Sequence, residues 1–149
     1  MTDQPIAHTK DGRPLFDNTP TVVVMLVKRG GDLLLIRRAN QPGFGKIALP
    51  GGYHMRGEVW QMAGAREVAE ETGYVLERPD LIRQVGEVVT DEYGNNLVIA
   101  LYDSGPMRHD PDVKQPGETL EVMWTPWFGS AEDWAFPRHY AAAKTELES

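Results

Sequence analysis

The chain has 149 residues, a formal net charge of −7 and no cysteine. This length suits one domain that buries about two thirds of the surface exposed by the unfolded chain. The acidic balance argues against electrostatic binding to nucleic acid or anionic membranes, and the lack of cysteine excludes disulfides, cysteine nucleophiles and thiolate metal sites.

Residues 1–20 lack both a basic start and an apolar stretch of signal-peptide length. We treat them as an N-terminal extension of a single domain that spans residues 21–149. The strongest early apolar run, Val22 to Val27, is too short to cross a bilayer. We therefore expect a cytoplasmic protein without a membrane partner.

Two β-rich segments at 22–27 and 33–38, separated by a glycine turn, predict a β-hairpin. Strands around one central helix, followed by a terminal helix, predict a mixed sheet flanked by helices, an α/β fold. The remaining expected elements are a loop at 40–45, a short strand at 47–49, a second hairpin at 84–90 and 97–102, an exposed loop at 104–117, a strand at 119–128 and a terminal helical region from Ser130 toward Leu147 with a break around Pro137.

The central helix carries residues of two kinds. Small and apolar residues recur at helical spacing and predict a buried stripe, while three glutamates spaced three and four apart share another face. Three close carboxylates repel one another unless a cation binds them, and all-oxygen ligand sets suit Mg²⁺ or Mn²⁺. The alternative is a solvated acidic face on which Arg66 pairs with Glu70. The stripe is Met62, Ala65, Val68, Ala69 and Thr72, and the acidic face is Glu67, Glu70 and Glu71.

Gly64 lies in the middle of this helix, where glycine costs about 1 kcal/mol relative to alanine. Its presence indicates either close approach by another element or simple tolerance of the weaker helix former. We favour tolerance.

The segment from Gly52 to Tyr74 resembles the signature of the Nudix hydrolases, which runs glycine, five residues, Glu, seven residues, Arg-Glu-aliphatic-any-Glu-Glu-any-Gly-aliphatic. Only the final aliphatic position departs, because Tyr74 occupies it. The resemblance extends over roughly residues 21–140 and implies an α/β/α sandwich with a mixed sheet. The matching positions are Gly52, Glu58, Arg66, Glu67, Val68, Glu70, Glu71 and Gly73.

The resemblance implies metal-dependent hydrolysis of the pyrophosphate bond in a nucleoside diphosphate linked to a further group, with Mg²⁺ or Mn²⁺ as the cofactor. Glu70 and Glu71 are the expected metal ligands, and family members use the position of Glu67 either as a third ligand or as the base. Arg66 is expected to orient Glu67, and Glu58 to support the site from behind the ligands. The catalytic set is thus Glu67, Arg66 and Glu70, and the metal set is Gly51 (through its carbonyl), Glu67, Glu70 and Glu71.

Outside the signature, several residues are candidates for substrate binding. Arg37 and Arg38 alternate sides of a strand, so at most one of them faces the cleft and contacts phosphate. The aromatic rings of Phe44, Tyr53 and Tyr93 either stack on a nucleobase or simply pack. The candidates for an additional base or ligand are Glu118, Glu121, Asp110 and Asp112.

The stretches at 38–43 and 48–52 resemble family members that cleave ADP-ribose or sugar nucleotides, so the expected partner is a small nucleotide and ADP-ribose is favoured. The alternatives are hydrolysis of nucleoside triphosphates or dinucleoside polyphosphates, and a non-catalytic nucleotide-sensing Nudix module. A sensor commonly loses signature acids, whereas this chain keeps all of them. A homodimer is an expectation by analogy, and a lid formed by residues 104–117 is a hypothesis from loop composition.

Overall fold

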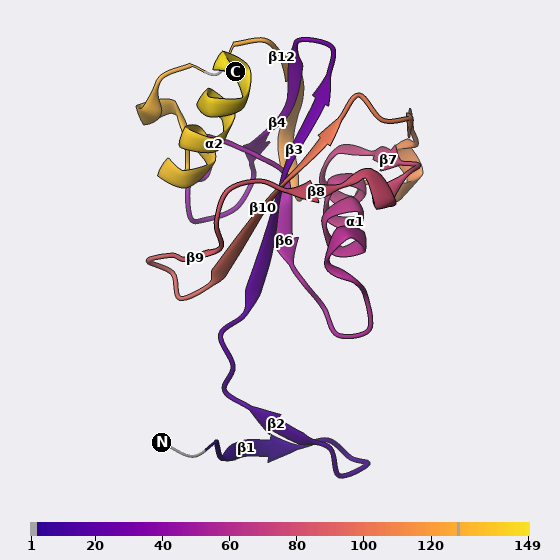
Figure 1. The fold of residues 1–149 in the computed structure, drawn as a ribbon, viewed down its shortest axis with the longest axis vertical. Coiled ribbons are helices and arrows are strands. Elements are labelled where there is room, and N and C mark those ends of the chain that lie inside the picture. Colours follow the sequence, from indigo (N-terminus) through magenta and orange to yellow (C-terminus); the bar gives the residue numbers. More distant parts are fainter. Residues whose placement is uncertain (1–2, 128) are drawn as a thin grey trace.

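The computed structural model describes residues 3–127 and 129–149. A mixed β-sheet lies between two helices, with α1 (Trp60–Thr72) on one side and α2 (Pro137–Glu148) on the other (Figure 1). The α/β arrangement predicted from the sequence is confirmed.

The central sheet is built around β3 (Thr21–Arg29), which pairs antiparallel with β4 (Asp32–Arg38) and parallel with β10 (Asn96–Asp103). The first predicted hairpin is therefore present, and the parallel pair makes the sheet mixed. The long path through the sheet runs β12-β4-β3-β10-β8, with three short strands attached beside it. The other strands of this sheet are β5 (Ile47–Ala48), β6 (Gly51–Tyr53), β8 (Arg83–Gln84), β9 (Val89–Thr90) and β12 (Thr119–Thr125).

Three predicted strands are shorter in the structure than in the sequence-based expectation. The strand expected at 47–49 ends at Ala48. The segment 84–90 forms only β8 and β9, which pair antiparallel with β10 on either side of a break at Gly86, whose φ is positive. The strand expected at 119–128 ends at Thr125, and Phe128 lies outside the described residues.

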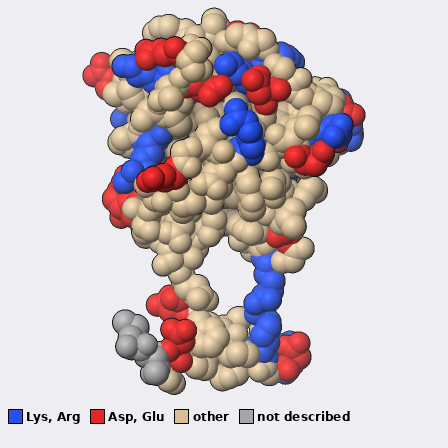
Figure 2. Space-filling model, in the orientation of Figure 1, with Lys and Arg blue, Asp and Glu red and all other residues tan. Residues whose placement is uncertain are grey.

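Four short strands were not predicted. β1 (Pro5–His8) and β2 (Pro14–Phe16) form a hairpin that projects from the body of the molecule (Figures 1 and 2). β7 (Tyr74–Leu76) and β11 (Met107–His109) form a second pair, so residues 104–117 are not simply an irregular loop. The described part of the chain also contains three 3₁₀ turns, namely η1 (Pro79–Leu81), η2 (Pro111–Val113) and η3 (Ala131–Asp133).

The C-terminal region begins with η3, which Ser130 caps through a reciprocal pair of hydrogen bonds with Asp133. The helical region is broken before Pro137, as predicted, because η3 ends at Asp133 and Pro137 occupies the first turn of α2. Proline is favoured at that position because the first N–H groups of a helix have no intrahelical partner. Neither helix of the described residues combines the length and the apolar character that a bilayer crossing demands.

Side chains of β3 alternate between two cores. Val23, Met25 and Val27 pack in the cluster under α1, whereas Val24 and Leu26 pack in the cluster under α2. This alternation is the period-two pattern of a strand buried on both faces. One strand therefore positions both helices.

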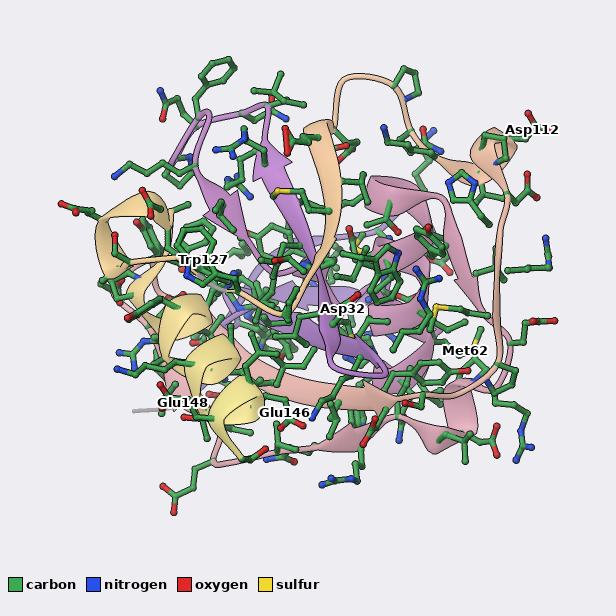
Figure 3. The ribbon with its side chains drawn as sticks, turned by 90° about the horizontal axis from the view of Figure 1, so that it is seen from above. Asp32, Met62, Asp112, Trp127, Glu146 and Glu148 are labelled. Atoms are coloured by element: carbon green, nitrogen blue, oxygen red, sulfur yellow. The ribbon has the colours of Figure 1, made fainter. Side chains whose placement is uncertain are left out.

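The buried stripe of α1 differs from the prediction at its start. Met62 is 47% exposed and lies on the outer side of α1 (Figure 3), whereas Ala63 and Gly64 are buried. The face toward β3 is occupied by small residues because the helix approaches the strand closely. A Cβ atom on Gly64 would lie 2.5 Å from Met25 Sδ and 3.1 Å from Val23 Cγ1. The preference for simple tolerance at Gly64 was wrong, since a side chain has no room there.

Substituting Gly64→Ala is expected to lower the free energy of unfolding by about 1 to 3 kcal/mol, although alanine is the better helix former, because the added methyl overpacks Met25. Chemical denaturation measures this change. Gly31→Ala is the matched control, because no atom lies within 4 Å of a Cβ at that position. A Gly64→Ala protein more stable than wild type would contradict the packing explanation.

Candidate active site

A cavity of about 430 Å³ opens beside the start of β6, between α1 and the first turn of α2. Its walls come from parts of the chain that are far apart in sequence, including the signature helix, the turn between β9 and β10 and the C-terminal helix. Gly51 lines it together with the signature residues Gly52, Glu67, Glu70 and Glu71.

Arg66 forms hydrogen bonds with several acidic residues beside this cavity. Its guanidinium donates to both carboxylate oxygens of Glu58, at 2.8 and 3.0 Å, and to Glu67 at 3.0 Å. The same group reaches Glu70 at 3.2 Å and the Tyr53 carbonyl at 2.9 Å. The pair of Arg66 with Glu70 is thus part of a larger network that sets the direction of several carboxylates.

Glu58 precedes α1 and anchors Arg66 from outside the cavity. It also accepts the Met55 N–H at 2.9 Å. The hydrogen bonds from Arg66 lower the pKa of Glu58 to about 2, so this carboxylate remains charged at all ordinary pH values. Glu58 holds Arg66, and Arg66 in turn orients the acids that line the cavity.

Glu71 links α1 to the turn before β6. Its Oε1 accepts the Gly51 N–H at 2.7 Å, and the residue is only 5% exposed. Burial raises the pKa of Glu71 well above its usual value, against the opposing effect of the Gly51 N–H. A Cβ atom on Gly51 would lie 2.5 Å from the Val23 carbonyl oxygen, so only glycine allows β6 to approach β3 here.

Glu67 lies against the neighbouring glycine. A Cβ atom on Gly52 would be 2.3 Å from Glu67 Cδ, so this glycine leaves the space that the carboxylate fills. Burial raises the pKa of Glu67 to about 7, and the charges of Glu70 and Glu118 act in the same direction against Arg66. A carboxyl group in this state can accept and release a proton near neutral pH.

The carboxylates of the cavity have the oxygen donors that a hard divalent cation prefers, but their side chains are not oriented around a common metal position. Within residues 3–127 and 129–149, no three acidic or histidine side chains are arranged around one metal position. The carboxylates are turned instead toward Arg66 and the Gly51 amide. Glu67, Glu70 and Glu71 supply only oxygen atoms, the donor type that Mg²⁺ and Mn²⁺ prefer, and all three line the cavity.

Later parts of the chain hold the C-terminal end of α1. Gly73 adopts the left-handed conformation at φ 82°, and its carbonyl accepts the Asp110 N–H at 2.7 Å. The Gln115 N–H donates to the Glu70 carbonyl at 2.7 Å, and Thr119 Oγ1 donates to the Glu71 carbonyl at 3.0 Å. These bonds satisfy carbonyls that have no partner within a helix. Residues 104–117, all described, support the helix and do not line the cavity.

The two arginines of β4 have different surroundings. Arg38 lines the cavity, with its Nε donating to the Pro42 carbonyl at 2.7 Å. Arg37 points elsewhere, donating to the Gly45 carbonyl at 2.9 Å and lying 3.8 Å from Glu121. Alternation along the strand explains the difference, and Arg38 is the one that reaches the cleft.

The remaining candidates divide in the same way. Tyr53, Tyr93 and Glu118 line the cavity. Phe44 is not among the described lining residues, because it lies on an exposed loop. Glu121, on β12, lies beside Arg37 of β4 and not at the cavity. Arg37, Phe44 and Glu121 are thus not among the residues that line this cavity, and their assignment to the site stays a prediction. Asp110 caps η2 and Asp112 lies at the periphery of the molecule (Figure 3).

The sequence did not point to the wall contributed by α2. Phe136, Arg138 and His139 line the cavity opposite the signature helix. His139 shares a buried face of α2 with Ala143, four residues on. That spacing was the available signal, but a single histidine on an apolar stripe usually indicates packing.

The family comparison decides the identity of the domain. A family model described as the NUDIX domain matches residues 17–140. The chain belongs to the Nudix family. The resemblance inferred from the signature is confirmed, and so is the expected Nudix fold.

Individual relatives agree with this placement. The chain is 30% identical over 104 residues to a protein named ADP-ribose pyrophosphatase from Methanocaldococcus jannaschii, a match that covers 68% of this chain and 62% of the relative. The match thus spans less than two thirds of that relative. Similar solved structures are the NUDIX domain of Shewanella oneidensis NrtR with ADP ribose (TM-score 0.67, 21% identity, 89% of each chain) and a bifunctional NMN adenylyltransferase/ADP ribose pyrophosphatase from Francisella tularensis with AMP and a Mn ion (TM-score 0.65, 21% identity, 89% of this chain and 42% of that one).

The adjacent glycines Gly51 and Gly52 are expected to respond differently to alanine. Gly51→Ala should lower the free energy of unfolding by about 2 to 3 kcal/mol, because the methyl meets the β3 backbone. Gly52→Ala should cost less than about 1 kcal/mol, because a flexible carboxylate can move, yet it should weaken Mn²⁺ binding about tenfold by displacing Glu67. Denaturation and metal titration measure the two effects. Equal losses of stability would contradict this distinction.

The buried His139 should make stability depend on pH. Burial lowers its pKa to about 3, whereas the unfolded chain binds a proton near pH 6.5, so the folded state binds fewer protons and loses stability as pH falls below 6.5. Between pH 7 and pH 5 wild type should lose about 2 kcal/mol relative to His139→Asn. Urea denaturation at both pH values tests this, with the exposed His8→Asn as control. Parallel curves for wild type and His139→Asn would contradict a buried neutral imidazole.

Proposed function

We propose that this protein hydrolyses the pyrophosphate bond of a nucleoside diphosphate linked to a further group, in a metal-dependent reaction, with ADP-ribose as the preferred substrate. The observation that carries the proposal is the convergence of Glu67, Glu70 and Glu71 from one helix on a single cavity. Arg38 lines the same cavity. The cavity therefore combines carboxylates that can bind a metal cation with a guanidinium suited to binding phosphate.

The cofactor would be Mg²⁺ or Mn²⁺, held by Glu70, Glu71 and the Gly51 carbonyl. Of the two roles that the family gives the Glu67 position, third ligand and base, we propose the base. Such an ion supplies Lewis acidity that neutralises phosphate oxygens and makes the attacking water more acidic. This assignment draws on the oxygen-only donor set, on the raised pKa of Glu67 and Glu71, and on the general use of divalent metals in the family.

The side chains have separate tasks in the proposed reaction. Water attacks phosphorus, the bridging P–O bond of the diphosphate breaks, and ADP-ribose gives AMP and ribose 5-phosphate. Glu67 accepts the proton of the water, for which its pKa near 7 is suited, and later releases it to solvent. Arg66 donates to Glu67 and fixes the direction of the accepting oxygen. Glu118, which also lines the cavity, is the second candidate for the base.

Arg38 is proposed to bind the diphosphate. Its Nε is occupied by the Pro42 carbonyl, which fixes the guanidinium while its terminal nitrogens remain available at the cavity wall. A fixed guanidinium suits phosphate recognition because less side-chain freedom is lost on binding. The choice of ADP-ribose draws on the name of the Methanocaldococcus jannaschii relative and on the ligand of the NrtR domain.

Activity is tested by incubating the protein with ADP-ribose, sugar nucleotides, nucleoside triphosphates and dinucleoside polyphosphates in Mg²⁺, Mn²⁺ or EDTA. We expect AMP and ribose 5-phosphate in equal amounts from ADP-ribose, no product in EDTA, and a loss of turnover of about 100-fold or more in Glu71→Gln. Mass spectrometry in H₂¹⁸O identifies which phosphorus atom is attacked.

Glu148→Gln is the control, because it removes the same charge from the exposed end of α2 (Figure 3). Turnover by Glu71→Gln at the wild-type rate would defeat the assignment of the metal site. Binding of ADP-ribose without any product would support a nucleotide-sensing module in place of an enzyme.

A further inference from the structure

His139 is held rigidly at the wall of the cavity. It lies in the first turn of α2, on the opposite side of the sheet from α1 (Figure 1), and is 8% exposed. Its Nδ1 accepts the Leu49 N–H at 3.2 Å, and its ring packs against Phe136 with the centroids 4.7 Å apart. One face and one nitrogen of the imidazole are therefore fixed by the protein.

This arrangement determines where the ring carries its proton. A backbone N–H can only donate, so Nδ1 is unprotonated. Burial lowers the pKa of His139 to about 3, and the charge of Arg38 acts in the same direction against the opposing charge of Asp91, so the ring is neutral at physiological pH. The single proton of a neutral imidazole then resides on Nε2, which is a hydrogen-bond donor.

Nε2 has no acceptor in the protein but retains contact with the cavity. Among the described residues, no hydrogen bond involves this atom. The one fully buried side-chain polar atom of the described chain that lacks a partner is Trp124 Nε1, so His139 Nε2 is not sealed from solvent. The space that His139 lines is the cavity, and a buried ring thus presents one unpaired donor to it.

The neighbours of His139 suit a planar, uncharged group. Phe136 is met edge-on by Tyr93, with centroids 5.9 Å apart, and the Arg38 guanidinium lies 5.0 Å from its centroid. Aromatic surfaces favour stacking with flat rings. Because Arg38 already supplies a charged donor suited to phosphate, a neutral N–H beside aromatic rings is better matched to a ring nitrogen or a carbonyl.

We propose that His139 is a specificity-determining residue, whose Nε2–H donates to a hydrogen-bond acceptor on the nucleobase of the substrate. Because the Leu49 N–H occupies Nδ1 as an acceptor, the proton of the neutral ring stays on Nε2, and Nε2 remains a donor. The inference rests on the proposed function for the class of ligand, a nucleotide, but it concerns binding of the base and not cleavage.

The test uses two substitutions that separate the two ring nitrogens. In His139→Asn the side-chain oxygen can replace Nδ1 as the acceptor for Leu49, while the donor at Nε2 is lost. In His139→Gln the amide nitrogen lies near the position of Nε2 and keeps a donor there. Calorimetry measures the affinity of wild type and both variants for AMP, GMP, CMP and UMP, and thermal unfolding verifies that each variant is folded. His8→Asn, exposed on β1, is the control.

We expect His139→Asn to weaken the best-bound nucleotide by about 3- to 10-fold, the range of one neutral hydrogen bond, and to reduce the differences among the four bases. His139→Gln should retain more of the base preference than His139→Asn. In wild-type protein, ¹⁵N NMR should show the Nε2–H tautomer, and its signal should shift when AMP is added. This measurement keeps the proposal testable if the variants do not fold.

Equal weakening of all four nucleotides would overturn the proposal, because the donor would then contact the sugar or the phosphate. Unchanged affinities, an unmoved ¹⁵N signal, or no binding of any nucleotide by wild type would overturn it as well. The assay does not need turnover. Base preference that depends on His139 in a protein that cleaves nothing would refute the proposed hydrolysis alone, whereas cleavage with base preference independent of His139 would refute this inference alone.

Discussion

The contact between the Gly51–Gly52 backbone and two carboxylates of α1 is the constraint on which the site depends. The Gly51 N–H binds Glu71, and the bare Cα of Gly52 leaves room for Glu67. Gly51 also lies against the β3 backbone. The main chain of this one residue therefore contacts both the central sheet and α1. Acids on an isolated helix would turn to water, whereas here they are enclosed and directed into one cavity.

Enclosing these acids has an electrostatic cost that the chain offsets locally. Arg66 is shared among the carboxylates of Glu58, Glu67 and Glu70, and the strongly acidic Glu58 anchors it from outside the cavity. One cation cannot neutralise every acid, so Glu67 and Glu71 retain raised pKa values. The protein thus maintains a deficit of positive charge at the cavity, a condition that favours divalent cations and phosphate-bound metals over neutral ligands.

The sequence predicted the features whose signal is local and missed those that need distant partners. The hairpin of β3 and β4 follows from alternation and a glycine turn, and the signature acids follow from helical spacing. The predicted buried stripe is wrong at Met62, which is exposed. Close packing of the helix on β3 requires small residues, and Ala63 and Gly64 are buried there instead. The β7–β11 pair and the role of His139 depend on contacts with residues tens of positions away, which no local pattern encodes.

The hydrogen bond from Leu49 to His139 joins residues separated by 90 positions. During synthesis, the residues of the wall formed by Phe136 and His139 are added after those of the acidic helix. A nascent chain can therefore assemble the carboxylate side of the cavity while the opposite wall is still missing. Any ligand whose affinity requires both walls will bind only chains that extend through the first turn of α2, so it stabilises those chains and leaves shorter ones to proteolysis.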